Sequence, residues 1–441
     1  MSAPWVVVGA GSAGCVVAAR LTEDERREVV LVESGPGLEP GTVPAQVAGA
    51  NFLATAELQD RNDVGLLARR VSGGVATLYR RGRGVGGSSV VNAMVALRGD
   101  PALYRSWGWD DVDSLWDVVA LPEQPPGDDE LGPVDLALLA ADGDAQRAPL
   151  TRRGRRRVTS AEAYLWPALG RPNLTIRSDA EVARIVIEGR RAVGVVLSTG
   201  DEIDAGRVIV CAGAIRTPAL LLRSGLDTPG IGLGLQDHPS VPLTLGLRDG
   251  VTVDTDGLVI GAVRQRDGVQ FLPMNHLGPG APGLGLLLVA LMTPLGRSGS
   301  VRIDPERPDA SPLVDFALLD DPADLHALAA AVGDALALTR TGPFRDIVDE
   351  IMIDDVGTTS DVLRDTGAIE RWLPSAVGDY VHASSSCAMG SVVDADGAVF
   401  GYESLYVCDA SVFPTIPDVN THLPTTMLAE RLSARWRRSH P

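Results

Sequence analysis

The sequence predicts an α/β fold, α+β overall, with one domain on a parallel sheet and a second on an antiparallel sheet. Residues 5–33 contain an apolar run, a glycine turn, a helix-like run and a second apolar run, which is typical of a parallel βαβ unit. Between residues 241 and 315, short apolar segments alternate with turns, which indicates antiparallel strands. A chain of 441 residues is long enough for two domains.

The N-terminal stretch carries a glycine pattern with a physical purpose. Trp5–Val8 is a short apolar run that predicts a strand buried on both faces. Gly9, Gly11 and Gly14 follow with the spacing G-x-G-x-x-G, and a helix-like run comes next. The first glycine permits a tight turn, the second lets a pyrophosphate approach the backbone, and the third lets the helix pack on the strand. The helix start then offers free N–H groups to the phosphates.

An acidic residue completes this pattern. The second apolar run, Val29–Val32, ends at Glu33, whose carboxylate is placed to bind the two hydroxyl groups of a ribose. The alternative is a glycine turn in some other α/β domain. Strand, glycine turn, helix, second strand and acidic residue together favour a Rossmann-like dinucleotide site.

The middle of the chain adds a second glycine-rich loop and more strands. Residues 80–94 contain four glycines and two serines that can close on a flat or anionic ligand, which predicts a second cofactor contact. Thr159–Leu169 is expected to be helical, with Ser160 as its cap. Strands are expected at Leu174–Ile176, Val182–Ile187, Ala192–Leu197, Arg207–Cys211, Val241–Leu247, Leu258–Arg264, Val269–Asn275, Leu284–Met292 and Gly299–Ile303.

The C-terminal segment carries the reactive side chains. His382 precedes a run of small polar residues, and Asp409 follows the apolar run Leu405–Cys408. At a strand end, this aspartate can accept hydrogen bonds from cofactor hydroxyls or orient backbone amides. Asn420 and His422 stand just before a terminal helix.

Composition narrows the range of partners. The net charge of −18 argues against nucleic acid or an anionic membrane. The four cysteines are scattered without metal-ligand spacing, so buried free thiols and a reducing compartment are expected, and no metal site is predicted. The chain shows neither a signal peptide nor an apolar run long enough to span a membrane, so we expect a cytoplasmic protein.

Several separate motifs resemble those of the glucose–methanol–choline (GMC) oxidoreductase family, in the family's order. Residues 82–99 and 213–226 are similar to its two signatures. Leu235-Gln236-Asp237-His238-Pro239 resembles its "LQDHP" motif. Residues 382–424 resemble the C-terminal segment that carries the family's active-site residues. The chain departs from the family pattern at Asp227, Gly234 and Ser384–Ser386, and it is short for the family.

This resemblance implies FAD as cofactor. Some family members attach FAD covalently through a histidine of the first signature; Val91 occupies that place here, so noncovalent binding is expected. The predicted cofactor-binding residues are Gly9, Gly11, Ser12, Ala13, Gly14, Glu33, Arg83, Gly86, Gly87, Ser88, Asn92, Ala93, Met94, Val182, Ala212, Gly213, Asp409, Ala410, Thr421, His422 and Thr425.

The resemblance also implies oxidation of an alcohol, with His382 taking the hydroxyl proton. A second residue binds the same oxygen. By position this partner is Asn420, but a shift of two residues would bring in His422, and both stay open. A neutral imidazole suits a base near pH 7, so activity is expected to fall at low pH. His238 is expected to have a structural role in a turn.

The reaction implied is hydride transfer from a small alcohol to FAD, more in the manner of a dehydrogenase than of an oxygen-using oxidase. The compact form and the close at residues 420–425 resemble mycofactocin-associated members, which implies mycofactocin, a quinone or the respiratory chain as acceptor. The alternatives are an oxygen-using oxidase, a hydroxynitrile-lyase-type enzyme with structural FAD, and a non-catalytic flavin-binding protein.

These interpretations give a domain map. Residues 1–110, 151–235 and 380–441 are assigned to a discontinuous FAD-binding domain. Residues 111–150, which are acidic and contain prolines, are assigned to a linker or surface excursion, and residues 236–379 to the substrate-binding domain.

Overall fold

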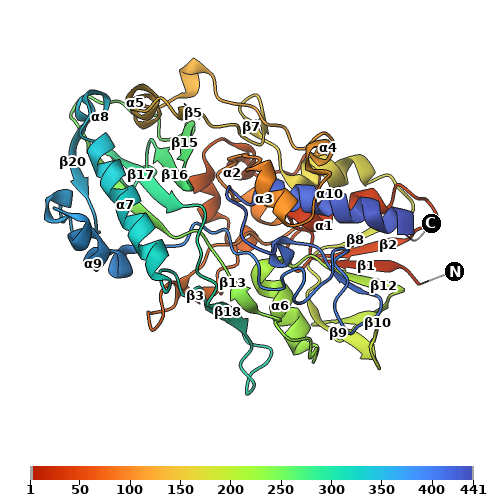
Figure 1. Ribbon diagram of the computed structural model, residues 1–441. Coiled ribbons are helices and arrows are strands. Elements are labelled where there is room, and N and C mark those ends of the chain that lie inside the picture. Colours follow the sequence, from red (N-terminus) through yellow and green to blue (C-terminus); the bar gives the residue numbers. More distant parts are fainter. Residues whose placement is uncertain (1–2, 440–441) are drawn as a thin grey trace.

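A five-stranded parallel sheet organises one half of the molecule. The computed structural model describes residues 3–439 (Figure 1). The strand order is β21-β12-β1-β2-β8, with every neighbouring pair parallel. Layers on both faces bury these strands, which explains their nearly continuous apolar sequences. The bounds are β1 Trp5–Val8, β2 Val29–Val32, β8 Leu174–Arg177, β12 Arg207–Val210 and β21 Leu405–Val407.

Helices from the two ends of the chain cover one face of this sheet. Helix α1 (Ser12–Leu21) packs against α10 (His422–Ser439), and Figure 1 shows the two side by side. The other side carries a three-stranded antiparallel sheet of β9 (Val182–Glu188), β10 (Arg191–Leu197) and β11 (Glu202–Asp204). Strand β10 of this sheet contacts β12. Within the described residues, no helix is both long and apolar enough to cross a membrane.

The second half is built on a six-stranded antiparallel sheet with the order β20-β14-β17-β16-β15-β5. Helices α7 (Pro322–Leu338) and α9 (Thr366–Ala376) pack together, and α7 covers β17. The bounds of the strands are β5 Ala145–Arg147, β14 Ser240–Leu247, β15 Ala262–Arg266, β16 Val269–Met274, β17 Leu284–Leu291 and β20 Val348–Met352. The predicted α/β fold with a second antiparallel sheet is confirmed.

Two of the expected strands differ from those observed. The run expected at Leu258–Arg264 becomes a strand only from Ala262, and residues 258–261 are irregular, with the carbonyl of Val259 accepting the backbone N–H of Asn275 at 2.9 Å. The run expected at Gly299–Ile303 forms β18 (Gly299–Arg302), which joins a separate sheet of order β13-β18-β19-β3-β4. The other strands of that sheet are β3 Leu67–Arg69, β4 Thr77–Leu78, β13 Leu233–Leu235 and β19 Leu313–Asp315.

The segment 111–150 is not the linker that its prolines and acidic residues suggest. It forms α4 (Val112–Trp116), α5 (Pro133–Ala141) and β5, and β5 pairs with β15 at the edge of the six-stranded sheet. Val134 and Leu138, one helical turn apart, are fully buried and hold α5 on that sheet. The segment therefore belongs in part to the second half of the molecule. The other domain boundaries stay a prediction.

Short elements complete the chain. The expected helix at Thr159–Leu169 is instead a π-helical turn, η5 (Ala161–Leu165), followed by the 3-10 turn η6 (Trp166–Ala168). The expected cap, Ser160, makes no capping hydrogen bond there. The remaining elements are α2 Ala45–Ala48, η1 Phe52–Glu57, η2 Gln59–Arg61, η3 Gly87–Val90, α3 Pro101–Ser106, η4 Asp128–Glu130, β6 Arg152–Arg153, β7 Arg156–Arg157, α6 Gly213–Arg223, α8 Gly342–Arg345, η7 Ser360–Val362 and η8 Ala410–Val412.

Candidate active site

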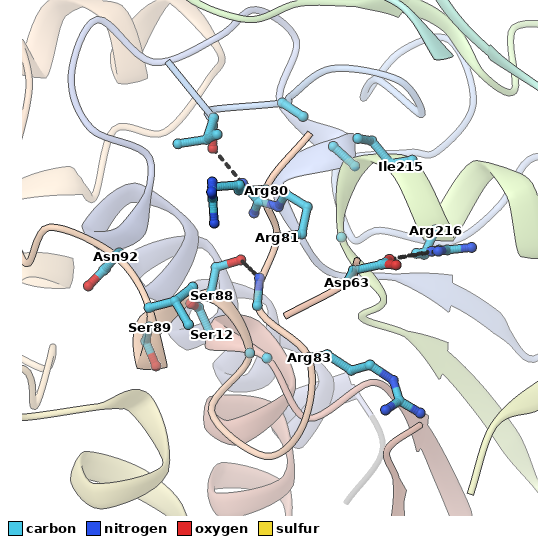
Figure 2. A pocket seen from close by; sticks show the side chains of 18 of the residues that line it. Ser12, Asp63, Arg80, Arg81, Arg83, Ser88, Ser89, Asn92, Ile215 and Arg216 are labelled. Carbon is cyan, nitrogen blue, oxygen red and sulfur yellow. Dashed lines mark hydrogen bonds and ion pairs between the residues drawn. The ribbon is translucent and has the colours of Figure 1, made fainter. Parts of the chain in front are cut away.

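A cavity of about 860 Å³ lies between the carboxyl ends of the parallel strands and the six-stranded sheet. Figure 2 shows Ser12 and Ser88 on one side of it and the ion pair of Asp63 with Arg216 on the other. The three predicted catalytic residues, His382, Asn420 and His422, all line this cavity. So do Gly9, Gly11, Ser12, Ala13, Glu33, Arg83, Gly87, Ser88, Asn92, Ala93, Met94, Val182, Ala212, Gly213, Asp409, Ala410, Thr421 and Thr425.

Two of the predicted cofactor residues, Gly14 and Gly86, do not line the cavity and act behind its wall. A Cβ on Gly14 would lie 1.8 Å from the carbonyl oxygen of Gly9, so this glycine is needed for α1 to pack on the turn. Gly86 has a φ of +99° and donates its N–H to the carbonyl of Ala10, which ties the second glycine loop to the first. Both glycines therefore have a role in loop packing, and their contact with the cofactor stays a prediction.

The first glycine loop leaves room for a ligand at one position. A Cβ on Gly11 would meet no protein atom closer than the Cα of Gly87, at 3.9 Å, and its φ of −76° suits any residue. The protein itself therefore does not require glycine there. The position faces the cavity at the start of α1, where free N–H groups and the helix dipole favour a pyrophosphate. This cradle fits a dinucleotide.

Glu33 supports both glycine loops. Its carboxylate accepts hydrogen bonds from the backbone N–H groups of Ala10 (2.8 Å), Gly35 (2.9 Å) and Gly84 (3.0 Å), and from the Ser34 hydroxyl (3.2 Å). A carboxylate accepts about four such bonds. Oε2 accepts the Ala10 N–H, and Glu33 lines the cavity, so binding of the two ribose hydroxyls by this carboxylate stays a prediction.

Asp409 organises the other strand end. Its carboxylate accepts from the backbone N–H groups of Gly213 (2.9 Å) and Ser411 (2.8 Å), and from the Thr217 hydroxyl. Burial raises the pKa of Asp409, whereas these donors lower it. Of the two roles open from the sequence, orientation of backbone amides is the one that these contacts support.

The ring of His382 is held in one tautomer by a second histidine. Nε2 of His238 lies 2.9 Å from the carbonyl oxygen of Pro417, so Nε2 carries the proton. Burial lowers the pKa of His238 to about 3, which leaves its Nδ1 as an acceptor. The Nδ1 atoms of His238 and His382 are 2.9 Å apart, and therefore His382 donates from Nδ1. The lone pair of His382 is then on Nε2, in a side chain that lines the cavity.

Asp237 fixes the backbone around both histidines. It accepts the backbone N–H of His238 (2.7 Å) and of His382 (3.0 Å), and the Tyr79 hydroxyl (2.7 Å). Burial, and next Asp379, raise the pKa of Asp237 to about 7, against these donors. His238 was expected to serve only in a turn, yet its ring and its neighbour Asp237 hold the predicted base in place.

The environment of His382 gives a pH prediction. Burial, together with His238 and Arg81, lowers the pKa of His382 well below 6.5. A histidine must be neutral to act as a base. A lower pKa therefore keeps the enzyme active at lower pH. We expect the rate of flavin reduction to be flat between about pH 6.5 and 9 and to decline only at lower pH. Rapid-mixing measurements across this range test it; an apparent pKa at or above 6.5 for the rising limb would contradict it.

Asn420 belongs to a closed set of polar side chains. Its Oδ1 accepts from Nε2 of Gln270 at 3.3 Å, and its Nδ2 donates to the Tyr380 hydroxyl. Tyr380 in turn donates to Oε1 of Gln270. An asparagine amide has two N–H donors, so one remains for an oxygen in the cavity. The rings of Tyr380 and His382 are in edge contact, with centroids 4.7 Å apart, so this set of side chains adjoins the base through Tyr380.

His422 has both ring nitrogens engaged. Its Nδ1 accepts from Nδ2 of Asn92 at 3.2 Å, and its Nε2 donates to the Ser160 hydroxyl at 3.0 Å. Burial, then the neighbouring Arg157, lower its pKa to about 4, so the ring is neutral. A neutral imidazole with both nitrogens bonded has no lone pair left for a substrate proton.

The buried Arg157 sets the orientation of Asn92. It donates to the carbonyl oxygen and to Oδ1 of Asn92, at 2.7 and 2.6 Å, and to the carbonyl of Val47 at 2.9 Å. The sequence placed this arginine in a basic surface run, although burial lowers its pKa to about 10. No local signal distinguishes it from the exposed arginines around it. Gln270 and Tyr380 were missed for the same reason, because single polar residues in apolar strands or loops carry no motif.

The fold and the cavity define a dinucleotide-dependent oxidoreductase. A dinucleotide cradle opens here onto a histidine with a free lone pair and an amide donor. In residues 3–439, no group of three or more histidine, cysteine, aspartate or glutamate residues could hold a metal ion.

The chain belongs to the GMC oxidoreductase family. The family's N-terminal part matches residues 4–120 and 143–240, and its C-terminal part matches residues 294–429. The family is FAD-dependent, and its members are oxidoreductases that act on CH–OH donors. The resemblance found in the motifs is thereby confirmed.

Relatives match over nearly the whole chain. An uncharacterised GMC-type oxidoreductase of Rhodococcus erythropolis is 32% identical, with 98% of both chains covered. The 5-(hydroxymethyl)furfural oxidase of Methylovorus is 29% identical, with 97% of both chains covered. Among solved structures, pyridoxine 4-oxidase from Mesorbium loti is 25% identical, with a TM-score of 0.87 and 100% of both chains covered.

Proposed function

We propose that the protein oxidises the CH–OH group of an alcohol to a carbonyl, with noncovalently bound FAD. The observation that carries this proposal is the tautomer of His382: its Nδ1–H is committed to His238, which leaves a lone pair on Nε2 in the cavity. The family supports the CH–OH donor, and relatives named as oxidases of 5-(hydroxymethyl)furfural and pyridoxine support an alcohol substrate.

The chain's own residues divide the work at the substrate oxygen. Nε2 of His382 accepts the hydroxyl proton as the C–H bond breaks. The remaining Nδ2 proton of Asn420 binds the same oxygen and stabilises the negative charge that develops on it. Bound FAD supplies the two-electron acceptor for the hydride that leaves the alcohol carbon. His422 contributes by holding Asn92, not by touching the proton.

The side chain at position 91 supports noncovalent attachment. Val91 lines the cavity where covalent members have a histidine, and an aliphatic side chain offers no atom for a bond to the flavin. Acid precipitation of the purified protein is the direct check, because noncovalent FAD stays in the supernatant.

The electron acceptor stays a prediction. The sequence favours a non-oxygen acceptor of the dehydrogenase kind, including mycofactocin or a quinone, whereas relatives of comparable similarity carry names that include "oxidase" and "oxygen-dependent". Reoxidation of the reduced protein by air, by a quinone and by a dye, compared at equal concentration, separates these readings.

The partner of His382 can be identified with two substitutions. We expect Asn420→Ala to lower the anaerobic rate of flavin reduction by about 10²–10³-fold, because a donor to the charged oxygen is lost. His422→Ala is expected to lower it by less than about 10-fold, since its ring only supports Asn92. FAD content, measured from absorbance, is the control for both. The reverse order of effects would assign the role to His422.

A further inference from the structure

Beyond Gln270, the face of the six-stranded sheet that looks onto the catalytic residues carries apolar side chains. Gln270, Leu272 and Met274 alternate along β16 and so share one face. Leu288 of β17 is the cross-strand partner of Leu272. Because Gln270 bonds Asn420, the same face of β16 that carries Leu272 and Met274 is turned toward the catalytic asparagine.

The apolar side chains continue around the catalytic histidine. Ile260, Leu272 and Met94 are buried in one apolar cluster with Tyr380, and Phe52 packs against it. Each of these five residues also lines the cavity. Since the Tyr380 ring is in edge contact with His382, this wall, which we call the apolar wall (Phe52, Met94, Ile260, Leu272, Met274 and Leu288), adjoins the base.

The charges near the wall are unfavourable to a cation. The acidic residues that line the cavity are Glu33, Asp63, Glu181, Asp309, Asp379 and Asp409. Asp379 is the sequence neighbour of Tyr380, and its carboxylate is held by Arg70 at 2.6 and 2.5 Å. The carboxylate of Asp237 accepts the backbone N–H of Tyr380 from behind the cavity lining and is bonded to the Tyr79 hydroxyl. Arg81 lies close enough to His382 to lower its pKa and donates to the carbonyl of Val381. Figure 2 shows Arg80 and Arg81 next to each other in the pocket.

Aromatic rings do not compensate for the lack of a free acid. A quaternary ammonium group is recognised by several ring faces or by a carboxylate. Of the phenylalanine, tyrosine and tryptophan residues in the described part of the chain, two line the cavity: Phe52 and Tyr380. Tyr380 is buried and already bonded to Gln270 and Asn420. A cation placed here would lose its hydration without gaining a partner.

We infer that the substrate is an uncharged alcohol with an apolar aryl or alkyl body, and that cationic alcohols such as choline are rejected. This inference rests on the proposed function. The hydroxyl group binds between His382 and Asn420, and the body of the alcohol packs on the apolar wall. The proton passes from the alcohol oxygen to Nε2 of His382, and FAD, where bound, would supply the acceptor for the two electrons and hydrogen that leave the carbon.

The test compares 4-methylbenzyl alcohol with choline as reductants of the holoenzyme under anaerobic conditions. The ratio of the limiting reduction rate to Kd is expected to favour 4-methylbenzyl alcohol by more than about 100-fold. A binding readout without chemistry uses phenol and tetramethylammonium in isothermal titration, since neither has a CH–OH carbon. Phenol is expected to bind at least about 10-fold more tightly.

Two variants at position 288 distinguish the effect of a negative charge on the apolar wall from the effect of a change in side-chain shape. Leu288→Glu places a carboxylate on the apolar wall, and Leu288→Gln is its matched neutral control. We expect Leu288→Glu to shift the preference toward choline by about 10-fold or more relative to Leu288→Gln. If either variant fails to retain FAD, the wild-type comparison with phenol and tetramethylammonium still decides.

The outcomes distinguish a wrong substrate class from a wrong proposed reaction. A preference for choline, or tighter binding of tetramethylammonium than of phenol, overturns the inference while leaving alcohol oxidation intact. Failure of both alcohols to reduce the flavin counts against the proposed function, and tighter binding of phenol would then still support an apolar ligand chamber.

Discussion

Replacement of His382 with glutamine is expected to lower the anaerobic rate of flavin reduction by about 10²–10⁴-fold, the usual contribution of a positioned general base. Glutamine preserves much of the size of the ring and can still contact His238, but its amide cannot take the hydroxyl proton. The pocket for FAD is formed by other residues, so FAD content should be unchanged. Rapid mixing with a saturating alcohol gives the rate.

His326→Gln is the matched control for this variant. The His326 ring is exposed and pairs with Glu370 on the surface, away from the cavity-lining residues. We expect this variant to reduce its flavin at the wild-type rate. A His382→Gln protein that keeps more than about one tenth of the wild-type rate would show that the proton goes elsewhere.

Replacement of Gly11 with alanine is expected to weaken the binding of FAD. The backbone of Gly11 suits alanine, and its Cβ would approach no protein atom closer than 3.9 Å, so folding should be unaffected. The methyl group would instead enter the space assigned to the pyrophosphate. We expect FAD affinity to fall by roughly 10- to 100-fold, as for an overpacked contact. Absorbance of the purified protein and titration of the apoprotein with FAD measure this change.

Gly143→Ala provides the comparison. Gly143 is exposed, and a Cβ there would have no neighbour within 4 Å. This variant should bind FAD as the wild type does. If Gly11→Ala also retains normal FAD affinity, the pyrophosphate does not lie against this glycine, and the cradle has been placed wrongly.

The parallel half of the fold could be predicted because its signals are local. The run Trp5–Val8, the glycine turn and Glu33 lie within one βαβ unit, and each residue type has a backbone or ligand reason to be there. The catalytic candidates could be named because they stand in motifs. His382, Asn420 and His422 all line the same cavity, although His422 comes 40 positions after His382.

The rest depended on contacts between distant segments. The His238 ring meets His382 across 144 positions, and nothing in the local sequence shows that the one histidine fixes the tautomer of the other. Arg157 looked like part of an exposed basic run, but the fold buries it beneath Asn92. The segment 111–150 looked like a linker because its acidic and proline residues outweigh the short apolar face of α5. Contacts between residues far apart in the sequence decide each of these three features, and local secondary-structure propensity does not.

In the proposed reaction, His382 and Asn420 act on an alcohol, and the bound FAD would accept its hydride. An anaerobic titration of the purified protein with an alcohol tests it most directly, with flavin absorbance and carbonyl product recorded together. We expect loss of the oxidised flavin absorbance, with one equivalent of carbonyl product for each flavin reduced. Formation of product with the flavin still oxidised would contradict it and indicate a lyase reaction on the same fold.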